Sequence, residues 1–157
     1  MDLFKILQTL AETPGPSGQE AGIAMVIAEM WRPLADEVRE DRMGNVVAVK
    51  RGVGEGERPR LLFAAHMDEI ALMVRQIVAY SPGKEGAGDE QAPGFLRLSR
   101  VGGVDLRHLY GQQVVVHGQR NLPGLIAALP THMLPSDRGD KVYNLDELVA
   151  DVGLPLG

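Results

Sequence analysis

The stretch "LLFAAHMDEIALMV", residues 61–74, decides how the rest of the sequence is interpreted. Its first five residues are all apolar, a pattern that predicts a strand buried on both faces of a sheet. His66, Asp68 and Glu69 follow closely, so polar groups stand where this buried strand ends. Open α/β sheets bind ligands at the carboxyl ends of their strands. We therefore expect this polar end of the strand to lie in a ligand site.

The sequence before this stretch predicts two helices. Residues 3–10 place apolar side chains at helical spacing, and Asp2 before them is suited to cap the helix. Ser17 and Glu20 fit the S-x-x-E capping box, which predicts the start of a second amphipathic helix. Pro33 closes that helix, because proline is poorly tolerated in a helix interior.

A hairpin follows the helices. "DEVRED" and "VVAVK", residues 36–41 and 46–50, are short strands around a turn at "RMGN", and a Gly-rich loop then leads to the buried strand. Two helices, a hairpin and a buried strand in this order are typical of the opening of an α/β sheet protein. We take α/β as the fold class.

The pattern of predicted elements changes after Glu69. Residues 70–77 are strand-like, and "FLRLSRVGG", "QQVVVHG" and "GLIAAL" are further short strands separated by turns. Residues 78–94 are expected to form a flexible insertion, and the tail from residue 144 a helical turn and a final strand. Short strands with turns and no long helix predict a small β-barrel. The expected domains are therefore 1–69 and 70–157.

Composition narrows the classes of partner. The net charge is −5, which argues against nucleic acid and anionic membranes, because both reward clustered Lys and Arg. The sequence has no cysteine, so thiolate metal ligands and disulfides are excluded. No signal-peptide pattern or membrane-length apolar window occurs, and we expect a soluble, cytoplasmic protein.

His66 and Asp68 carry the strongest chemical signal. Residues i and i+2 of a strand point to the same side, so the imidazole and the carboxylate are expected to be neighbours. A carboxylate beside an imidazole fixes its tautomer and ring angle, as a metal-ligating histidine requires. The alternative is a core histidine followed by the first acidic residues of a loop. The H-x-D-E pattern alone leaves both interpretations open.

The remaining histidines and the common motifs offer no comparable signal. His108, His117 and His132 are interpreted as residues of a helical turn, a strand end and a loop. No H-E-x-x-H pair is present. The sequence also lacks the G-x-S-x-G elbow and any cysteine nucleophile, so covalent hydrolase chemistry has no candidate.

Seven stretches in one order carry a resemblance to a known family. They are "SGQE", "DRMGNVVAVKRG", "LLFAAHMDEIALMV", "GFLRLSRVGGVD", "LYGQQVVVHG", "GLIAALPTHML" and "LDELVADVG". Together they resemble the tetrahedral aminopeptidases, co-catalytic metallopeptidases that include glutamyl and deblocking aminopeptidases. The resemblance covers nearly the whole chain and favours a metal role for His66.

The resemblance implies a fold and an activity. It implies the start of a mixed-sheet catalytic domain, interrupted after the H-x-D strand by an inserted β-barrel dimerisation domain. It also implies hydrolysis of amino-terminal residues from peptides by water that two divalent ions activate, zinc or cobalt, with manganese possible. His66 is similar to a metal ligand of the family, and Asp68 to the catalytic carboxylate that orients it. Glu69 matches the motif without an assigned role. Self-association through the β domain, up to a dodecamer, is expected.

The resemblance also implies that ligands are missing. The family supplies the bridging aspartate, a glutamate pair, another aspartate and a second histidine after the inserted domain. The acidic residues near the end of this sequence are interpreted as solvated loop or cap charges, or as part of the insertion: Asp137, Asp140, Asp146, Glu147 and Asp151. We expect the chain to be incomplete and inactive alone.

Two other functions remain open. A non-catalytic assembly or peptide-binding module would keep the β domain and lose the chemistry. A glucanase is disfavoured, because a lone H-x-D-E offers no paired carboxylates of glycosidase type.

Overall fold

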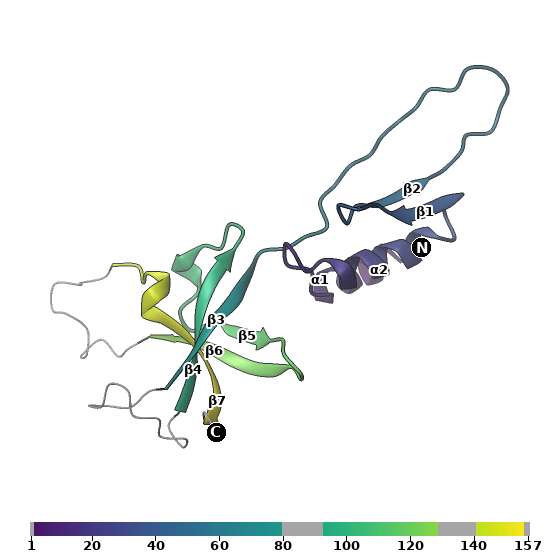
Figure 1. Cartoon of the computed structure of the whole chain (residues 1–157). Helices are drawn as coiled ribbons and strands as arrows, with labels where there is room; N and C mark the ends of the chain where they lie inside the picture. Colours follow the sequence, from purple (N-terminus) through teal and green to yellow (C-terminus); the bar gives the residue numbers. More distant parts are fainter. Residues whose placement is uncertain (1, 80–92, 129–140, 156–157) are drawn as a thin grey trace. The chain divides into compact units, whose positions relative to one another are not determined.

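The computed structural model describes residues 2–79, 93–128 and 141–155 and divides the chain into two compact units, residues 1–70 and 71–157 (Figure 1). The first unit contains α1 (Leu3–Glu12), α2 (Ala21–Trp31), β1 (Glu37–Glu40) and β2 (Val46–Val49). The second contains β3 (Ala71–Ala79), β4 (Pro93–Val101), η1 (Leu106–His108), β5 (Gln113–Val116), β6 (Leu122–Ala128), η3 (Leu145–Glu147) and β7 (Leu148–Pro155). The expected insertion at residues 78–94 lies largely outside the described residues.

Both helices of the first unit form where the sequence predicts them, but only one has the expected cap. The Asp2 carboxylate accepts from the Lys5 amide at 3.2 Å at the start of α1. The predicted capping box at α2 is wrong. Glu20 takes the cap position without a side-chain cap bond, and its carboxylate accepts from the Gly18 amide instead. The Ser17 hydroxyl binds elsewhere, as described below.

Strands β1 and β2 form the predicted antiparallel hairpin, with Glu37 opposite Val49 and Glu40 opposite Val46. Asp41 organises its turn. One carboxylate oxygen accepts from the amides of Met43 and Asn45, at 2.8 and 3.0 Å. Gly44 adopts φ +83°, the left-handed region that glycine enters without strain. The turn sequence therefore fixes the register of the hairpin.

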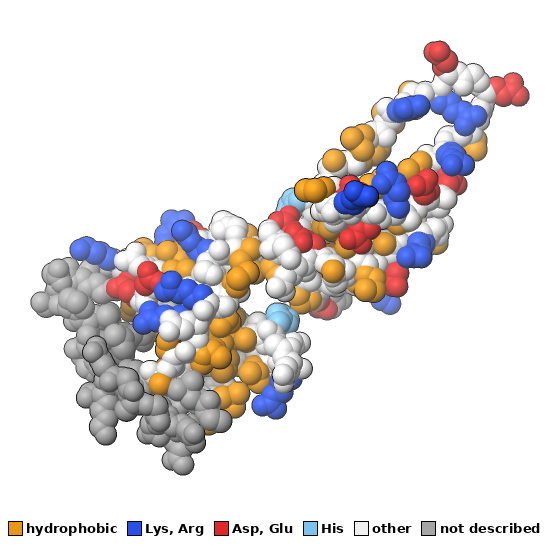
Figure 2. Space-filling view, viewed as in Figure 1, with side chains coloured by type: hydrophobic (Ala, Val, Ile, Leu, Met, Phe, Trp, Pro, Cys, Tyr) orange, Lys and Arg blue, Asp and Glu red, His pale blue; other side chains and the backbone are white. Residues whose placement is uncertain are grey.

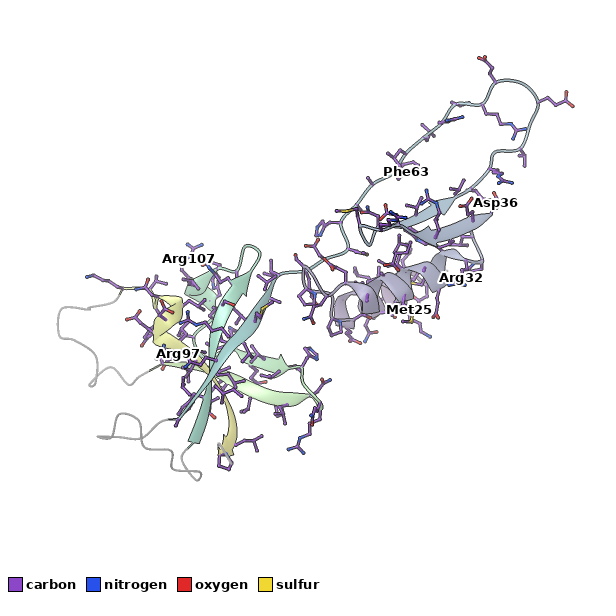
Figure 3. All side chains as sticks on the ribbon, in the orientation of Figure 1. Met25, Arg32, Asp36, Phe63, Arg97 and Arg107 are labelled. Atoms are coloured by element: carbon purple, nitrogen blue, oxygen red, sulfur yellow. The ribbon has the colours of Figure 1, made fainter. Side chains whose placement is uncertain are left out.

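Residues 61–65 do not form the buried strand that the sequence predicts. The structure assigns them no strand, and Leu61, Leu62 and Phe63 are 81%, 90% and 91% exposed. Figure 2 shows apolar side chains along this extended segment, and Figure 3 shows Phe63 clear of the helices. A central strand needs hydrogen-bonded neighbours on both sides. No described residue pairs with residues 61–65, so the apolar run stays open to water.

The second unit is one antiparallel sheet in the order β3-β4-β7-β6-β5. All five strands were predicted, and the α/β class with a curled sheet is confirmed (Figure 1). Within the described part of the chain, β3 pairs with β4 alone and β5 with β6 alone. Closure of the sheet into a barrel is therefore still a prediction.

The core of this unit comes from the three inner strands. Its buried side chains are Leu96 and Leu98 of β4, Ile126 of β6, and Leu148 and Ala150 of β7. Leu96 and Leu98, and likewise Leu148 and Ala150, are two positions apart, so each pair lies on one face of its strand. The sheet thus buries one continuous aliphatic face.

A bulge interrupts the pairing of β3 with β4 between Val74 and Gln76. The extra residue is Arg75, whose guanidinium lies 2.5 Å from a carboxylate oxygen of Asp146, beside η3. The bulge therefore aims a cation at the helical turn that precedes β7. None of the described helices is long and apolar enough to cross a lipid bilayer.

Candidate functional site

The structure brings His66 and Asp68 into contact, as their spacing predicts. Nδ1 of the imidazole lies 2.9 Å from the main-chain oxygen of Asp68 and 3.1 Å from its Oδ1. Both oxygens are acceptors, so the contact requires Nδ1 to carry the hydrogen. The neutral ring then presents the lone pair of Nε2, the form in which an imidazole binds a metal ion.

The ring is open to solvent. The side chain of His66 is 86% exposed, which contradicts the alternative of a core histidine. The contact with Asp68 also forms without strand geometry, because residues 66–68 are not in a strand. In this irregular segment the ring reaches the main-chain oxygen and Oδ1 of Asp68, in place of the expected shared strand face.

Ser17 completes the environment of Asp68. Its hydroxyl donates to Oδ2 at 2.5 Å, while Oδ1 faces the ring of His66. The Ser17 bond is the largest cause that holds the pKa of Asp68 below its ordinary value; desolvation opposes it, and the contact with His66 lowers the pKa further. Asp68 is therefore ionised at neutral pH, as an acceptor for two donors should be. The sequence missed Ser17, because S-x-x-E favoured a helix cap.

Glu69 binds the same loop that carries Ser17. Its carboxylate accepts from the Gly15 amide at 3.0 Å, and its own amide donates to the Gly15 carbonyl at 3.0 Å. An isolated parallel bridge pairs Pro16 with Glu69. The residue that matched a motif without an assigned role thus joins the loop of residues 13–18 to the H-x-D-E segment.

His66 is the one imidazole at this position, and the described residues supply no complete metal site. No group of three or more His, Asp or Glu side chains that could hold an ion occurs among them. The interpretation of Asp146 and Glu147 as loop and cap charges is confirmed: Asp146 pairs with Arg75, and Glu147 accepts from the Asn144 amide at the start of η3. Asp151 accepts from the Gly153 amide at 2.8 Å. Asp137 and Asp140 lie outside the described residues.

The other histidines lie where the sequence places them. His108 ends the helical turn η1, with Nε2 3.9 Å from a carboxylate oxygen of Asp105. His117 is exposed just beyond β5, and its Nδ1 lies 3.0 Å from Oδ1 of Asn121. Among the described residues, neither ring contacts both a side-chain and a main-chain oxygen of one aspartate, as Nδ1 of His66 does. His132 lies outside the described residues.

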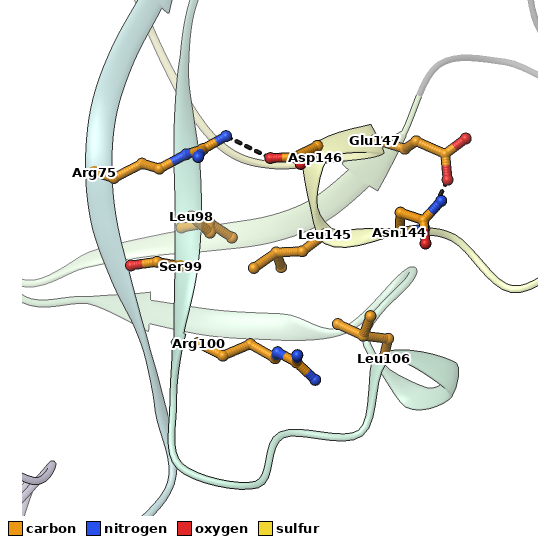
Figure 4. A pocket seen from close by; sticks show the side chains of 9 residues that line it. All are labelled: Arg75, Leu98, Ser99, Arg100, Leu106, Asn144, Leu145, Asp146 and Glu147. Carbon is orange, nitrogen blue, oxygen red and sulfur yellow. Dashed lines mark hydrogen bonds and ion pairs between the residues drawn. The ribbon is translucent and has the colours of Figure 1, made fainter.

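The second unit contains a hollow of about 610 Å³ between β3, β4 and η3 (Figure 4). Its lining is Arg75, Leu98, Ser99, Arg100, Leu106, Asn144, Leu145, Asp146 and Glu147. Cations and carboxylates lie on the same rim, and Arg75 is already neutralised by Asp146. Such mixed charge selects no ligand class, so His66 and its partners are the stronger candidate.

Comparisons with a family model and with curated proteins both point to aminopeptidases. Residues 44–155 match the family described as M42 glutamyl aminopeptidase. A lysyl aminopeptidase of Pyrococcus furiosus is 32% identical over 156 residues, which are 96% of this chain and 39% of that protein. The chain therefore spans about two fifths of the length of this relative.

Solved structures agree. A TET aminopeptidase from a marine-sediment thaumarchaeon matches with a TM-score of 0.79 and 32% identity, over 97% of this chain and 39% of that one. The Pyrococcus horikoshii TET1 peptidase, whose structure is described as assembling into a tetrahedron or a large octahedral shell, matches with a TM-score of 0.71 and 34% identity. That match covers 98% of this chain and 41% of the other.

Proposed function

The chain belongs to the M42 glutamyl aminopeptidase family, and from this premise we propose that it supplies one part of the centre of a metal-dependent aminopeptidase. The substrate class is peptides, from which amino-terminal residues are removed by hydrolysis. The chain is proposed to be inactive alone, because one imidazole cannot hold a pair of ions. His66 is the proposed metal ligand, and Asp68 the catalytic-site carboxylate that orients it.

One observation carries this proposal above all. Asp68 engages Nδ1 of His66 through two oxygens and leaves Nε2 without a described partner on a ring that is 86% exposed. A histidine whose Nδ1 is held by an aspartate and whose Nε2 faces solvent has the arrangement that metal-ligating histidines use.

Of the metal ligands that such a centre needs, the described residues fit one, His66. Two divalent ions, zinc, cobalt or manganese, would lower the pKa of a bound water and polarise the scissile carbonyl. Asp68 would keep the His66 tautomer and ring angle constant and would offset the positive charge next to the ring. The bridging carboxylate and the general base would come from polypeptide beyond the described residues.

Self-association belongs to the same proposal. The second unit is proposed to be the β-barrel dimerisation domain inserted in the catalytic domain, and a dodecamer is the largest assembly expected. Support comes from the edge strand β3, where Met73, Val74 and Ile77 are 49%, 41% and 61% exposed. A location in the cytoplasm is also proposed.

A non-catalytic module is the second candidate. It is favoured by the lack of any described group of three metal-ligating side chains. Such a module would bind no metal through His66 and would hydrolyse no peptide in any context.

The test compares metal binding at two histidines. We expect Co²⁺ to perturb the NMR signals of His66 in the 157-residue chain selectively, with weak affinity because a single imidazole is available. H66A removes this effect. H117A is the matched control, because His117 is also exposed and hydrogen-bonded but lacks the paired carboxylate contact.

Activity is tested by adding polypeptide. The chain alone should release no amino acid from a peptide substrate, whereas the chain extended by the part that its longer relatives contain should bind two metal equivalents and hydrolyse peptides. If Co²⁺ broadens His66 and His117 equally, or if the extended protein with H66A keeps full activity, the proposal is wrong.

A further inference from the structure

We propose that Ser17 is a positioning residue, which through Asp68 holds the imidazole of His66 in its Nδ1–H form. This inference rests on the proposed function and deepens it. Ser17 lies 51 positions before Asp68 in the sequence, yet its hydroxyl donates to Oδ2 at 2.5 Å. The carboxylate is thereby bound at both oxygens, on one side by the serine and on the other by the ring.

The physical need for such a residue follows from exposure. Neither His66 nor Asp68 lies in a regular element, and the His66 and Asp68 side chains are 86% and 39% exposed, so packing restrains the His66 rotamer little and that of Asp68 only in part. A carboxylate held by one hydrogen bond can rotate about its side-chain torsions. A second bond to the opposite oxygen restricts that rotation and leaves Oδ1 directed at the ring.

The loop that carries Ser17 is itself held firmly on two sides. Gly15 exchanges two hydrogen bonds of 3.0 Å with Glu69, one through the Glu69 side chain and one through its main chain. On the other side, a Cβ at position 15 would lie 2.5 Å from Cγ2 of Ile23, a buried residue of α2. Only glycine allows this approach.

The contacts of Gly15 with Glu69 and Ile23 link two separate segments of the first unit. They join the first turn of α2 to the H-x-D-E segment, so the position of Ser17 is set by a helix rather than by the exposed chain around His66. Because Ser17 is held in place by these contacts, it also holds Asp68, and through Asp68 the orientation of the His66 ring.

The test measures the tautomer of His66 without any metal. Long-range ¹H–¹⁵N spectra of the 157-residue chain are recorded at about pH 8.5, where an ordinary imidazole is neutral. We expect the Nδ1–H form to dominate in the wild type. S17A should raise the ratio of the Nε2–H to the Nδ1–H form roughly threefold, the factor that a hydrogen bond of low net strength supplies.

Two variants separate positioning from a general loss of structure. S17T retains a hydroxyl and should retain the wild-type ratio. S99A removes the hydroxyl that donates to the Met73 carbonyl at 3.4 Å in the other unit, and it should leave the ratio of His66 unchanged. Far-UV circular dichroism verifies that each variant keeps its secondary structure.

The outcomes distinguish this inference from the proposed function. If S17A leaves the tautomer ratio unchanged, or if S99A shifts it equally, Ser17 has no positioning role even when Co²⁺ still binds His66. If the ratio shifts as expected but Co²⁺ never binds His66, the role of Ser17 stands and the metal proposal fails. If S17A does not fold, E69A, which removes only the side-chain bond to Gly15, must shift the ratio in the same direction while E69Q does not; otherwise the inference is wrong.

Discussion

Few of the side chains that the structure describes are fully buried, and each therefore contributes strongly to stability. Ile126 is 1% exposed and Leu148 is fully inaccessible, and both belong to the aliphatic cluster of the second unit. Truncation of such a residue loses the transfer free energy of the removed methyl groups and leaves a cavity. Truncation of a neighbouring apolar residue that faces solvent costs much less free energy of unfolding, because it leaves no cavity.

I126A is expected to lower the free energy of unfolding of the second unit by about 2–5 kcal/mol, and I126V by about 0.5–1.5 kcal/mol. L125A is the matched control, because Leu125 precedes Ile126 on the same strand and is 46% exposed; a change of about 0.5 kcal/mol is expected. Urea unfolding followed by the amide signals of β6 and β7 measures all three. Equal losses for I126A and L125A would contradict the assignment of the core face.

Particular residues show which contacts of the candidate site could be predicted from the sequence. The i, i+2 spacing predicted the contact of His66 with Asp68 from strand geometry; the contact forms, but outside any strand. Ser17 could not be found in this way. Its partner is distant in sequence, and its local pattern matched a capping box that competes for the same hydroxyl. Glu69 likewise received its role only from a long-range contact.

At the scale of an element, a carboxylate stabilises the turn of the β1–β2 hairpin. Asp41 accepts from the Asn45 side-chain amide at 2.9 Å, besides the amides of Met43 and Asn45. The side-chain bond from Asn45 is the largest cause that lowers the pKa of Asp41 below 3.8, and the backbone bonds add to it. The folded hairpin therefore prefers the ionised carboxylate.

This preference gives the hairpin a defined response to acid. Because the folded pKa of Asp41 is lower than the unfolded one, the unfolded chain takes up the proton first as the pH falls. The stabilisation is fully present above about pH 4 and is lost as the pH falls through the folded pKa. A carboxyl-detected NMR titration should show the lowered pKa, and amide exchange in β1 and β2 should accelerate from pH 5 to pH 3 beyond its intrinsic change.

D41N provides the contrast. The variant should show no acid-dependent change of hairpin protection over that range. Protection at neutral pH should be lower, because the NH₂ group of the new side chain at position 41 cannot accept the hydrogen bonds that the carboxylate accepts from Met43 and Asn45. E37Q is the matched control, since Glu37 lies on the same hairpin outside the turn. If E37Q removes the acid response and D41N does not, Asp41 is not its source.

Strands whose partners lie within this chain were predictable, and the run at residues 61–65 was not. The hairpin and the strands of the second unit carry their turn residues and find their partners within this chain. The apolar run at residues 61–65 has equal strand character, yet it remains extended and exposed. Sequence pattern reports which side chains should be buried, but burial requires a neighbour that the pattern does not contain.

Across the whole molecule, the two units differ in how much they bury. The aliphatic cluster belongs to the second unit, whereas the buried apolar residues described in the first are Ile23 and Ala24. Local opening is easier where few apolar contacts must be broken. The first unit should therefore open at lower denaturant concentration than the second.

Hydrogen exchange of the intact chain tests this difference. The amides of β4, β6 and β7 should be the slowest to exchange, those of α1 and α2 intermediate, and those of residues 61–65 close to the rate of an unfolded peptide. In the extended protein, residues 61–65 should gain protection by a factor of 100 or more, on the order of that for a buried strand. Slow exchange of this run in the 157-residue chain would show that it is already paired.

The open run at residues 61–65 also governs how the chain behaves at high concentration. An extended, uncharged stretch of five apolar residues with free main-chain groups is a template on which identical stretches can stack into cross-β ladders. Arg60, which directly precedes the run, is a charged gatekeeper of the kind that limits such stacking. Fibrillation should therefore quicken when Arg60 is replaced by an uncharged residue, and loss of solubility would accompany any failure to cover this stretch.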